Sequence, residues 1–71
     1  MNIIVTFKKG NPITLTGVTK VKTGHKLVDS TYTGDEIKTM TFPSDKDILI
    51  QHAAGSFSIA ANTYEYISVE F

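Results

Sequence analysis

Apolar and polar residues alternate along almost the whole chain, and this pattern constrains the fold more than any other feature. Successive side chains of a strand point to opposite faces of a sheet, so alternation with a period of two predicts half-buried strands. No segment keeps an apolar face at helical spacing over three turns. The ten threonines and the many isoleucines and valines favour strands as well, because β-branched side chains pack well on a pleated surface. We therefore expect an all-β chain.

Gly, Pro, Asn and Asp residues divide this pattern into segments that we expect to form strands. The predicted strands cover residues 2–8, 12–22, 26–33, 36–42, 48–53, 56–60 and 65–71. A single helical turn is expected at 61–64. A strand, one tight turn and a last strand is a common ending of small SH3-like barrels, so a small antiparallel SH3-like barrel is the favoured architecture. An OB-like barrel and a two-sheet roll are the alternatives.

The length of 71 residues predicts one domain, spanning residues 1–71, with a thin core. The chain has no cysteine, so neither a disulfide nor a thiolate metal site can reinforce that core. The first residues lack the basic start and long apolar run of a signal peptide, which favours a cytoplasmic protein or a component of a particle assembled inside a cell. The predicted core residues are Val5, Phe7, Leu15, Val21, Ile37, Ile50, Ile59, Ile67 and Val69.

Three tight turns predict strand registers, because opposed residues of an antiparallel pair have a constant sum of residue numbers. The turns are expected at 9–11, at 24–25 and at 34–35. The predicted opposed pairs are Val5 with Leu15, Phe7 with Ile13, Gly17 with Tyr32, Lys20 with Asp29, Val21 with Val28, Leu27 with Phe42 and Tyr32 with Ile37.

The sequence offers no convincing catalytic or metal-binding set. His25 and His52 lack the paired spacing and the further ligands of a zinc site, and residues 45–47 lack the glycine and ligand number of a calcium loop. Asp47, His52 and Ser56 occur in one region but without a nucleophile elbow. We therefore expect that the protein is not an enzyme and binds no metal or cofactor.

The last predicted strand is the best candidate for a protein contact. It contains no lysine or proline, the residues with which monomeric proteins commonly protect an edge strand. Alternation predicts that Tyr64, Tyr66, Ser68 and Glu70 share the face that points away from the core. Tyrosine is enriched at interfaces. We expect these four residues to contact a protein partner or a second copy in a homodimer.

Lysines on the long predicted strand 12–22 are the second candidate site. Lys20 and Lys22 fall on one face, Lys8 lies near the end of the neighbouring strand, and Tyr32 is the nearest aromatic residue. Lysines beside an aromatic side chain on a sheet can bind single-stranded nucleic acid. Seven lysines balance seven acidic residues and arginine is absent, so attraction to phosphates or to anionic membranes is expected to be weak. Nucleic acid is therefore the alternative ligand, and no membrane contact is expected.

The segment Phe57-Ser58-Ile59, followed by Tyr66-Ile67-Ser68-Val69-Glu70, resembles the end of small uncharacterised all-β proteins from phages and mobile elements of Gram-positive bacteria. The lack of arginine beside abundant lysine, isoleucine, threonine and asparagine is similar to the same A+T-rich background. The resemblance covers a short C-terminal part of the chain and implies an origin rather than an activity. For a protein of that origin we expect an accessory or structural role, in the host cytoplasm or in the phage particle.

Overall fold

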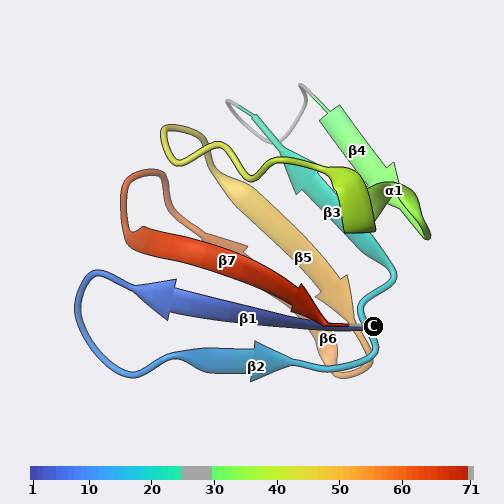
Figure 1. Cartoon of the computed structure of the whole chain (residues 1–71), viewed down its shortest axis with the longest axis horizontal. Coiled ribbons are helices and arrows are strands. Elements are labelled where there is room, and N and C mark those ends of the chain that lie inside the picture. Colours follow the sequence, from blue (N-terminus) through green and yellow to red (C-terminus); the bar gives the residue numbers. More distant parts are fainter. Residues whose placement is uncertain (25–29, 71) are drawn as a thin grey trace.

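Two antiparallel sheets and one helical turn make up the computed structural model, which describes residues 1–24 and 30–70. The strands are β1 (Asn2–Phe7), β2 (Ile13–Leu15), β3 (Lys20–Thr23), β4 (Ser30–Thr33), β5 (Ile48–His52), β6 (Gly55–Ile59) and β7 (Tyr64–Glu70), and the helical turn is α1 (Glu36–Thr39). One sheet has the order β2-β1-β7 and the other the order β4-β3-β5-β6 (Figure 1). The predicted all-β class is confirmed, and no closed barrel is detected within the described ranges.

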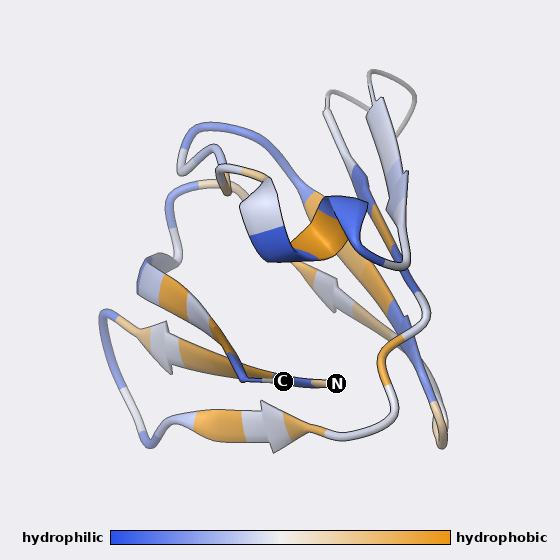
Figure 2. Cartoon of the chain, turned by 45° about the vertical axis from the view of Figure 1, so that its right-hand side comes forward, coloured by the Kyte–Doolittle hydropathy of each residue, from blue (hydrophilic) through white to orange (hydrophobic). Residues whose placement is uncertain are grey.

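The core lies between the two sheets and draws residues from both. Figure 2 shows hydrophobic segments on the strands of each sheet and on α1. The buried apolar residues are Ile3, Val5, Leu15, Val18, Val21, Ile37, Ile48, Ile50, Ile59 and Tyr64. Six of the nine predicted core residues are among them, whereas Phe7, Ile67 and Val69 are half-buried and pack against the cluster. The prediction missed Ile3, Val18, Ile48 and Tyr64.

The first hairpin has a different register from the predicted one. Val5 opposes Ile13, and Leu15 opposes Ile3 rather than Val5. The connection is longer than the three-residue loop that was expected. Pro12 has no N–H group to continue the ladder, and Phe7 opposes Tyr64 of β7 instead of Ile13.

The predicted strand 12–22 is wrong as one element, because the chain leaves the first sheet after Leu15 and enters the second at Lys20. Gly17 makes this crossing with a φ of +65°. A Cβ atom at Gly17 would lie 2.8 Å from the Cβ of Ala53, so the backbone passes where no side chain fits. Val18 then donates a backbone hydrogen bond of 2.9 Å to the carbonyl oxygen of Met1.

The second predicted hairpin is also shifted. Val21 opposes Tyr32, and Lys20 opposes Thr33, so Gly17 does not face Tyr32. The structure favours this register because it places half-buried Tyr32 beside buried Val21 on the core side. The expected partners Leu27, Val28 and Asp29 lie outside the described residues.

The segment predicted as strand 36–42 begins with the helical turn α1 instead. Gly34 adopts a φ of +55°, and its carbonyl oxygen accepts a hydrogen bond of 3.2 Å from the amide of Ile37. Glu36 Oε1 accepts hydrogen bonds of 3.2 Å from both the amide and the hydroxyl of Thr33. The turn places Ile37 fully inside the core, so Ile37 does not oppose Tyr32 across a ladder.

The last third follows the prediction more closely. β5 and β6 form a hairpin in which Ile50 opposes Phe57. The expected helical turn at 61–64 is a tight turn, with Asn62 at a φ of +64°, and β7 begins at Tyr64.

Candidate functional site

β7 forms one edge of the three-stranded sheet and is seven residues long. It pairs with β1 on one side (Figure 1). On its other side, no strand within residues 1–24 and 30–70 pairs with it. Such an unpaired edge leaves backbone N–H and C=O groups available to another chain.

A register shift in the pairing of β1 and β7 separates the two tyrosines. Thr6 opposes Tyr66, but Phe7 opposes Tyr64, so Glu65 is an extra residue on β7. An extra residue interrupts the alternation of side chains between the two faces. Tyr64 is therefore 2% exposed, whereas Tyr66 is 59% exposed. The prediction that both tyrosines lie on one exposed face is wrong for Tyr64.

Tyr64 stabilises the segment that precedes β5. Its hydroxyl donates a hydrogen bond of 2.6 Å to the carbonyl oxygen of Pro43. Burial raises the pKa of Tyr64 above its ordinary value, and the negative charge of Asp45 raises this pKa further. Tyr64 thus anchors the start of β7 and presents no surface to a partner.

The accessible part of β7 is the outer face that continues after the bulge. Tyr66 and Glu70 are exposed and Ser68 is half-buried. On β1, Ile4 opposes Ser68. Three of the four predicted contact residues therefore lie together on this face, which we call the β7 surface (Tyr66, Ser68 and Glu70, with the exposed Glu65 at the bulge).

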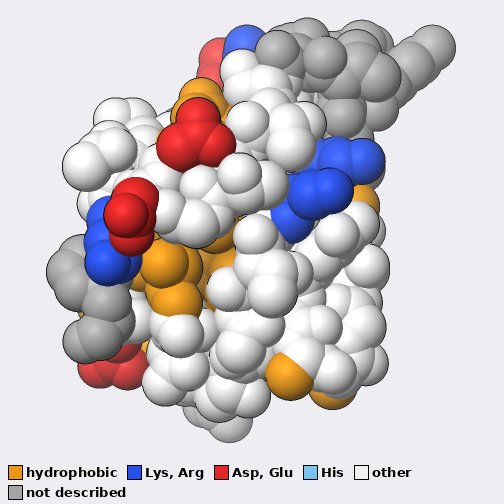
Figure 3. Space-filling view, turned by 90° about the vertical axis from the view of Figure 1, so that its right-hand side faces the viewer, with side chains coloured by type: hydrophobic (Ala, Val, Ile, Leu, Met, Phe, Trp, Pro, Cys, Tyr) orange, Lys and Arg blue, Asp and Glu red, His pale blue; other side chains and the backbone are white. Residues whose placement is uncertain are grey.

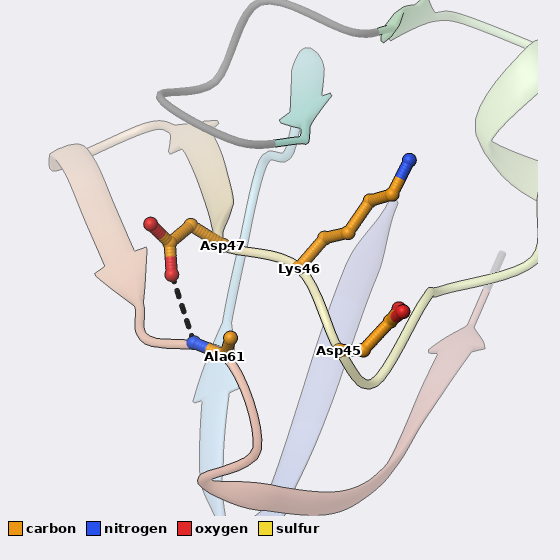
Figure 4. Close-up of a pocket in the computed structure, with 4 residues that line it drawn as sticks. All are labelled: Asp45, Lys46, Asp47 and Ala61. Carbon is orange, nitrogen blue, oxygen red and sulfur yellow. Dashed lines mark hydrogen bonds between the residues drawn. The ribbon is translucent and has the colours of Figure 1, made fainter.

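Segment 43–47 packs against the turn before β7, and its residues 45–47 line a small open pocket of about 70 Å³ with Ala61. Asp47 Oδ1 accepts a hydrogen bond of 2.9 Å from the amide of Ala61 (Figure 4). The side chains of Asp45 and Lys46 point away from this bond. No group of three or more metal-ligating side chains occurs in the described part of the chain. The Asp47 carboxylate thus holds the turn before β7 in place through its hydrogen bond with Ala61.

The four residues of the nucleic-acid candidate do not come together. Lys20 and Lys22 project from one face of β3, and Tyr32 opposes Val21, which points to the core face. Lys8 follows β1 in the other sheet. Lysine side chains are also scattered over the face of the molecule drawn in Figure 3. Tyr32 therefore does not lie on the face of Lys20 and Lys22, where a nucleic-acid base could stack on it.

A wider hollow of about 380 Å³ lies at one end of β1, between the loop that follows this strand and the turn before β7. It is lined by Phe7, Lys8, Lys9, Asn62 and Thr63. Lys8 donates a backbone hydrogen bond of 3.2 Å to the carbonyl oxygen of Thr63, which joins the two sides.

The residues considered for hydrolysis are also apart. Asp47 immediately precedes β5 and is bonded to Ala61, whereas His52 is the last residue of β5. Ser56 lies on β6 beside the His52 end, opposite Gln51. His25 lies outside the described residues.

Comparison with known proteins gave no match to a family model, a curated protein or a solved structure. None of the helices in residues 1–24 and 30–70 is long and apolar enough to cross a membrane.

Proposed function

We propose that this protein is a non-catalytic interaction module that binds an extended segment of a protein partner along the open edge of β7. The observation that carries the proposal is the combination of a seven-residue edge strand, an unpaired outer side and an exposed tyrosine. Strand addition at such an edge gains affinity from backbone hydrogen bonds and specificity from side chains on the two faces.

The other edges of the sheets are less suitable. β2 has three residues and β4 has four, which leaves few backbone groups for a partner. β6 has five residues, but they provide no exposed aromatic side chain to be buried. β7 is longer than these strands and carries Tyr66, so it supports the longest pairing.

The resemblance of residues 57–59 and 66–70 to small phage proteins supports a role as an accessory or structural component of a phage. We place its action in the host cytoplasm or in the particle. An SH3-like arrangement of the two sheets is part of the same proposal, since many small barrels of that class act as binding modules.

Substitution of Tyr66→Lys together with Ser68→Lys tests the proposal. Two lysines on the β7 surface remove the aromatic contact and protect the edge against strand addition. Thr14→Lys is the matched control, because Thr14 opposes Ile4 from β2 just as Ser68 opposes Ile4 from β7. The variants are compared by capture of partners from the native host with immobilised protein, after circular dichroism has shown that each is folded.

The expected result is loss of the captured partner for Tyr66→Lys with Ser68→Lys and full retention for Thr14→Lys. Amide hydrogen exchange of the complex should then show new protection in residues 65–70. Equal capture by all three proteins, or unchanged exchange in β7, would refute the proposal.

A further inference from the structure

The charges along β7 are of one sign. Glu65 and Glu70 are both exposed, and the strand contains no lysine, arginine or histidine. In the described part of the chain neither carboxylate forms a salt bridge. The open edge therefore has an acidic side chain near each end and Tyr66 between them.

Other charged residues near the strand lie at its Tyr64 end. Lys8 and Lys9 follow β1, and β1 lies on the paired side of β7 rather than on its open side. At the Tyr64 end, the charge of Asp45 acts on the tyrosine hydroxyl and raises its pKa. The bonded segment 43–47 thus brings another negative charge to this end, with Lys46 beside it in sequence.

A second copy is a poor occupant for this edge. The antiparallel register that pairs all seven residues of two β7 strands opposes Glu70 to Tyr64 of the other copy, and Glu65 to Val69. Residues in neighbouring rows of a ladder point to opposite faces, so Glu65 and Glu70 of the two copies do not face each other in this register. The second strand nevertheless brings no cation to either glutamate, and the two-fold symmetry leaves all four carboxylates at the interface without an opposite charge from the partner strand.

We infer that the partner segment is basic, with Lys or Arg side chains about five residues apart that face Glu65 and Glu70, and β-branched residues between them. This inference rests on the proposed function of β7. Opposite charges on paired strands attract, and like charges make the wrong partners unfavourable. The acidic ends would therefore select the partner and its register, while the backbone of β7 and Tyr66 supply the contact.

The probe is a seven-residue peptide of alternating valine and threonine, capped at both ends, with lysine at its first and sixth positions. A peptide with glutamate at those two positions is its control. Binding is followed by NMR through the amide shifts of residues 64–70, because this measurement detects weak complexes. We expect the lysine peptide to bind and to weaken severalfold as ionic strength rises, and the glutamate peptide to cause no shifts.

Two double variants separate local charge from net charge. Glu65→Gln with Glu70→Gln should lower the affinity for the lysine peptide about tenfold, since both facing charges are lost. Asp35→Asn with Glu36→Gln changes the net charge by the same amount on α1 and its preceding turn and should leave the affinity within about twofold. Equal loss in both double variants would show a net-charge effect and overturn the inference.

The remaining outcomes distinguish the inference from the proposed function. Suppose that Tyr66→Lys with Ser68→Lys abolishes partner capture, but the lysine and glutamate peptides bind equally or not at all. The proposed function of β7 then stands, and the inference that the partner segment is basic is wrong. If wild-type protein instead forms dimers that strengthen with added salt and dissociate in that variant, a second copy is the occupant, and the inference fails. If the variant captures the partner normally, the proposed function fails as well.

Discussion

The Tyr64 hydroxyl lies 2.6 Å from the carbonyl oxygen of Pro43, and this bond joins the start of β7 to the segment that leads into β5. It links two parts of the chain that the sheet ladders do not connect. A partner strand at the open edge would thus meet a β7 that is already fixed at one end.

Tyr64→Phe should lower the free energy of unfolding by about 1 kcal/mol, because the Pro43 carbonyl loses its donor while the aromatic ring stays in the core. Tyr66→Phe is the matched control and should change stability by less than about 0.5 kcal/mol, since Tyr66 is largely exposed. Urea unfolding followed by circular dichroism measures both. Equal effects of the two substitutions would contradict the role of the bond.

Stability should also depend on pH through Tyr64. Burial, with a further effect of Asp45, raises the pKa of Tyr64 in the folded protein, so the folded state holds the phenolic proton more tightly than the unfolded chain does. The stabilisation is fully present below the unfolded pKa of about 10 and is lost as pH rises through the higher folded value. The stability advantage of wild type over Tyr64→Phe should therefore shrink above pH 10. A constant difference between the two proteins from pH 8 to pH 11 would show that Tyr64 does not contribute in this way.

Gly17→Ala should be the more harmful of two alanine substitutions at glycines with similar backbone conformation. Gly17 and Gly34 have φ values of +65° and +55°, so both variants lose roughly 1 kcal/mol to the left-handed conformation. Only at Gly17 would the new Cβ lie 2.8 Å from Ala53, which adds about 1–3 kcal/mol of overpacking, whereas nothing lies within 4 Å at Gly34. Thermal unfolding of both variants measures the difference. Ala53→Gly in the Gly17→Ala background should recover part of the loss.

Ile50→Ala should destabilise the protein more than Ile67→Ala. Ile50 is fully buried, so its truncation should cost about 2–5 kcal/mol, while half-buried Ile67 should cost about half as much. Chemical denaturation of the two variants under the same conditions gives the comparison. A larger loss for Ile67 would mean that the core is centred nearer to β7 than the structure indicates.

The registers show what alternation can and cannot predict. The sum of residue numbers is 18 instead of 20 in the first hairpin and 53 instead of 49 in the second. Both differences are even, and an even shift leaves every side chain on its predicted face of the sheet. Val5 and Val21 therefore point to the core as predicted, although the residues opposite them differ from the prediction. Alternation determines the face of a residue, and loop length determines its partner. The expected loops are too short because Pro12 ends the first ladder early, and because β3 ends at Thr23 and β4 begins only at Ser30.

The candidate site was predicted correctly only for the residues that follow the bulge in β7. Tyr66, Ser68 and Glu70 have the expected facing because they follow Glu65 in unbroken alternation. Tyr64 does not, because one extra residue reverses the facing of everything before it, and no residue type in the sequence marks a bulge there.

The split of residues 12–22 into two strands had a visible signal in Gly17, whose positive φ permits the crossing between sheets.

The position of β1 between β2 and β7 sets an order of events in time. Asn2 opposes Glu70, so the three-stranded sheet needs nearly all of the described chain before it is complete. Closing so long a loop is entropically costly and slows folding, whereas β5 and β6 can pair as soon as both have left the ribosome. During synthesis the side of β1 that will pair with β7 therefore stays unpaired until β7 has been made. Any other strand that pairs with this side first would compete with β7 for it.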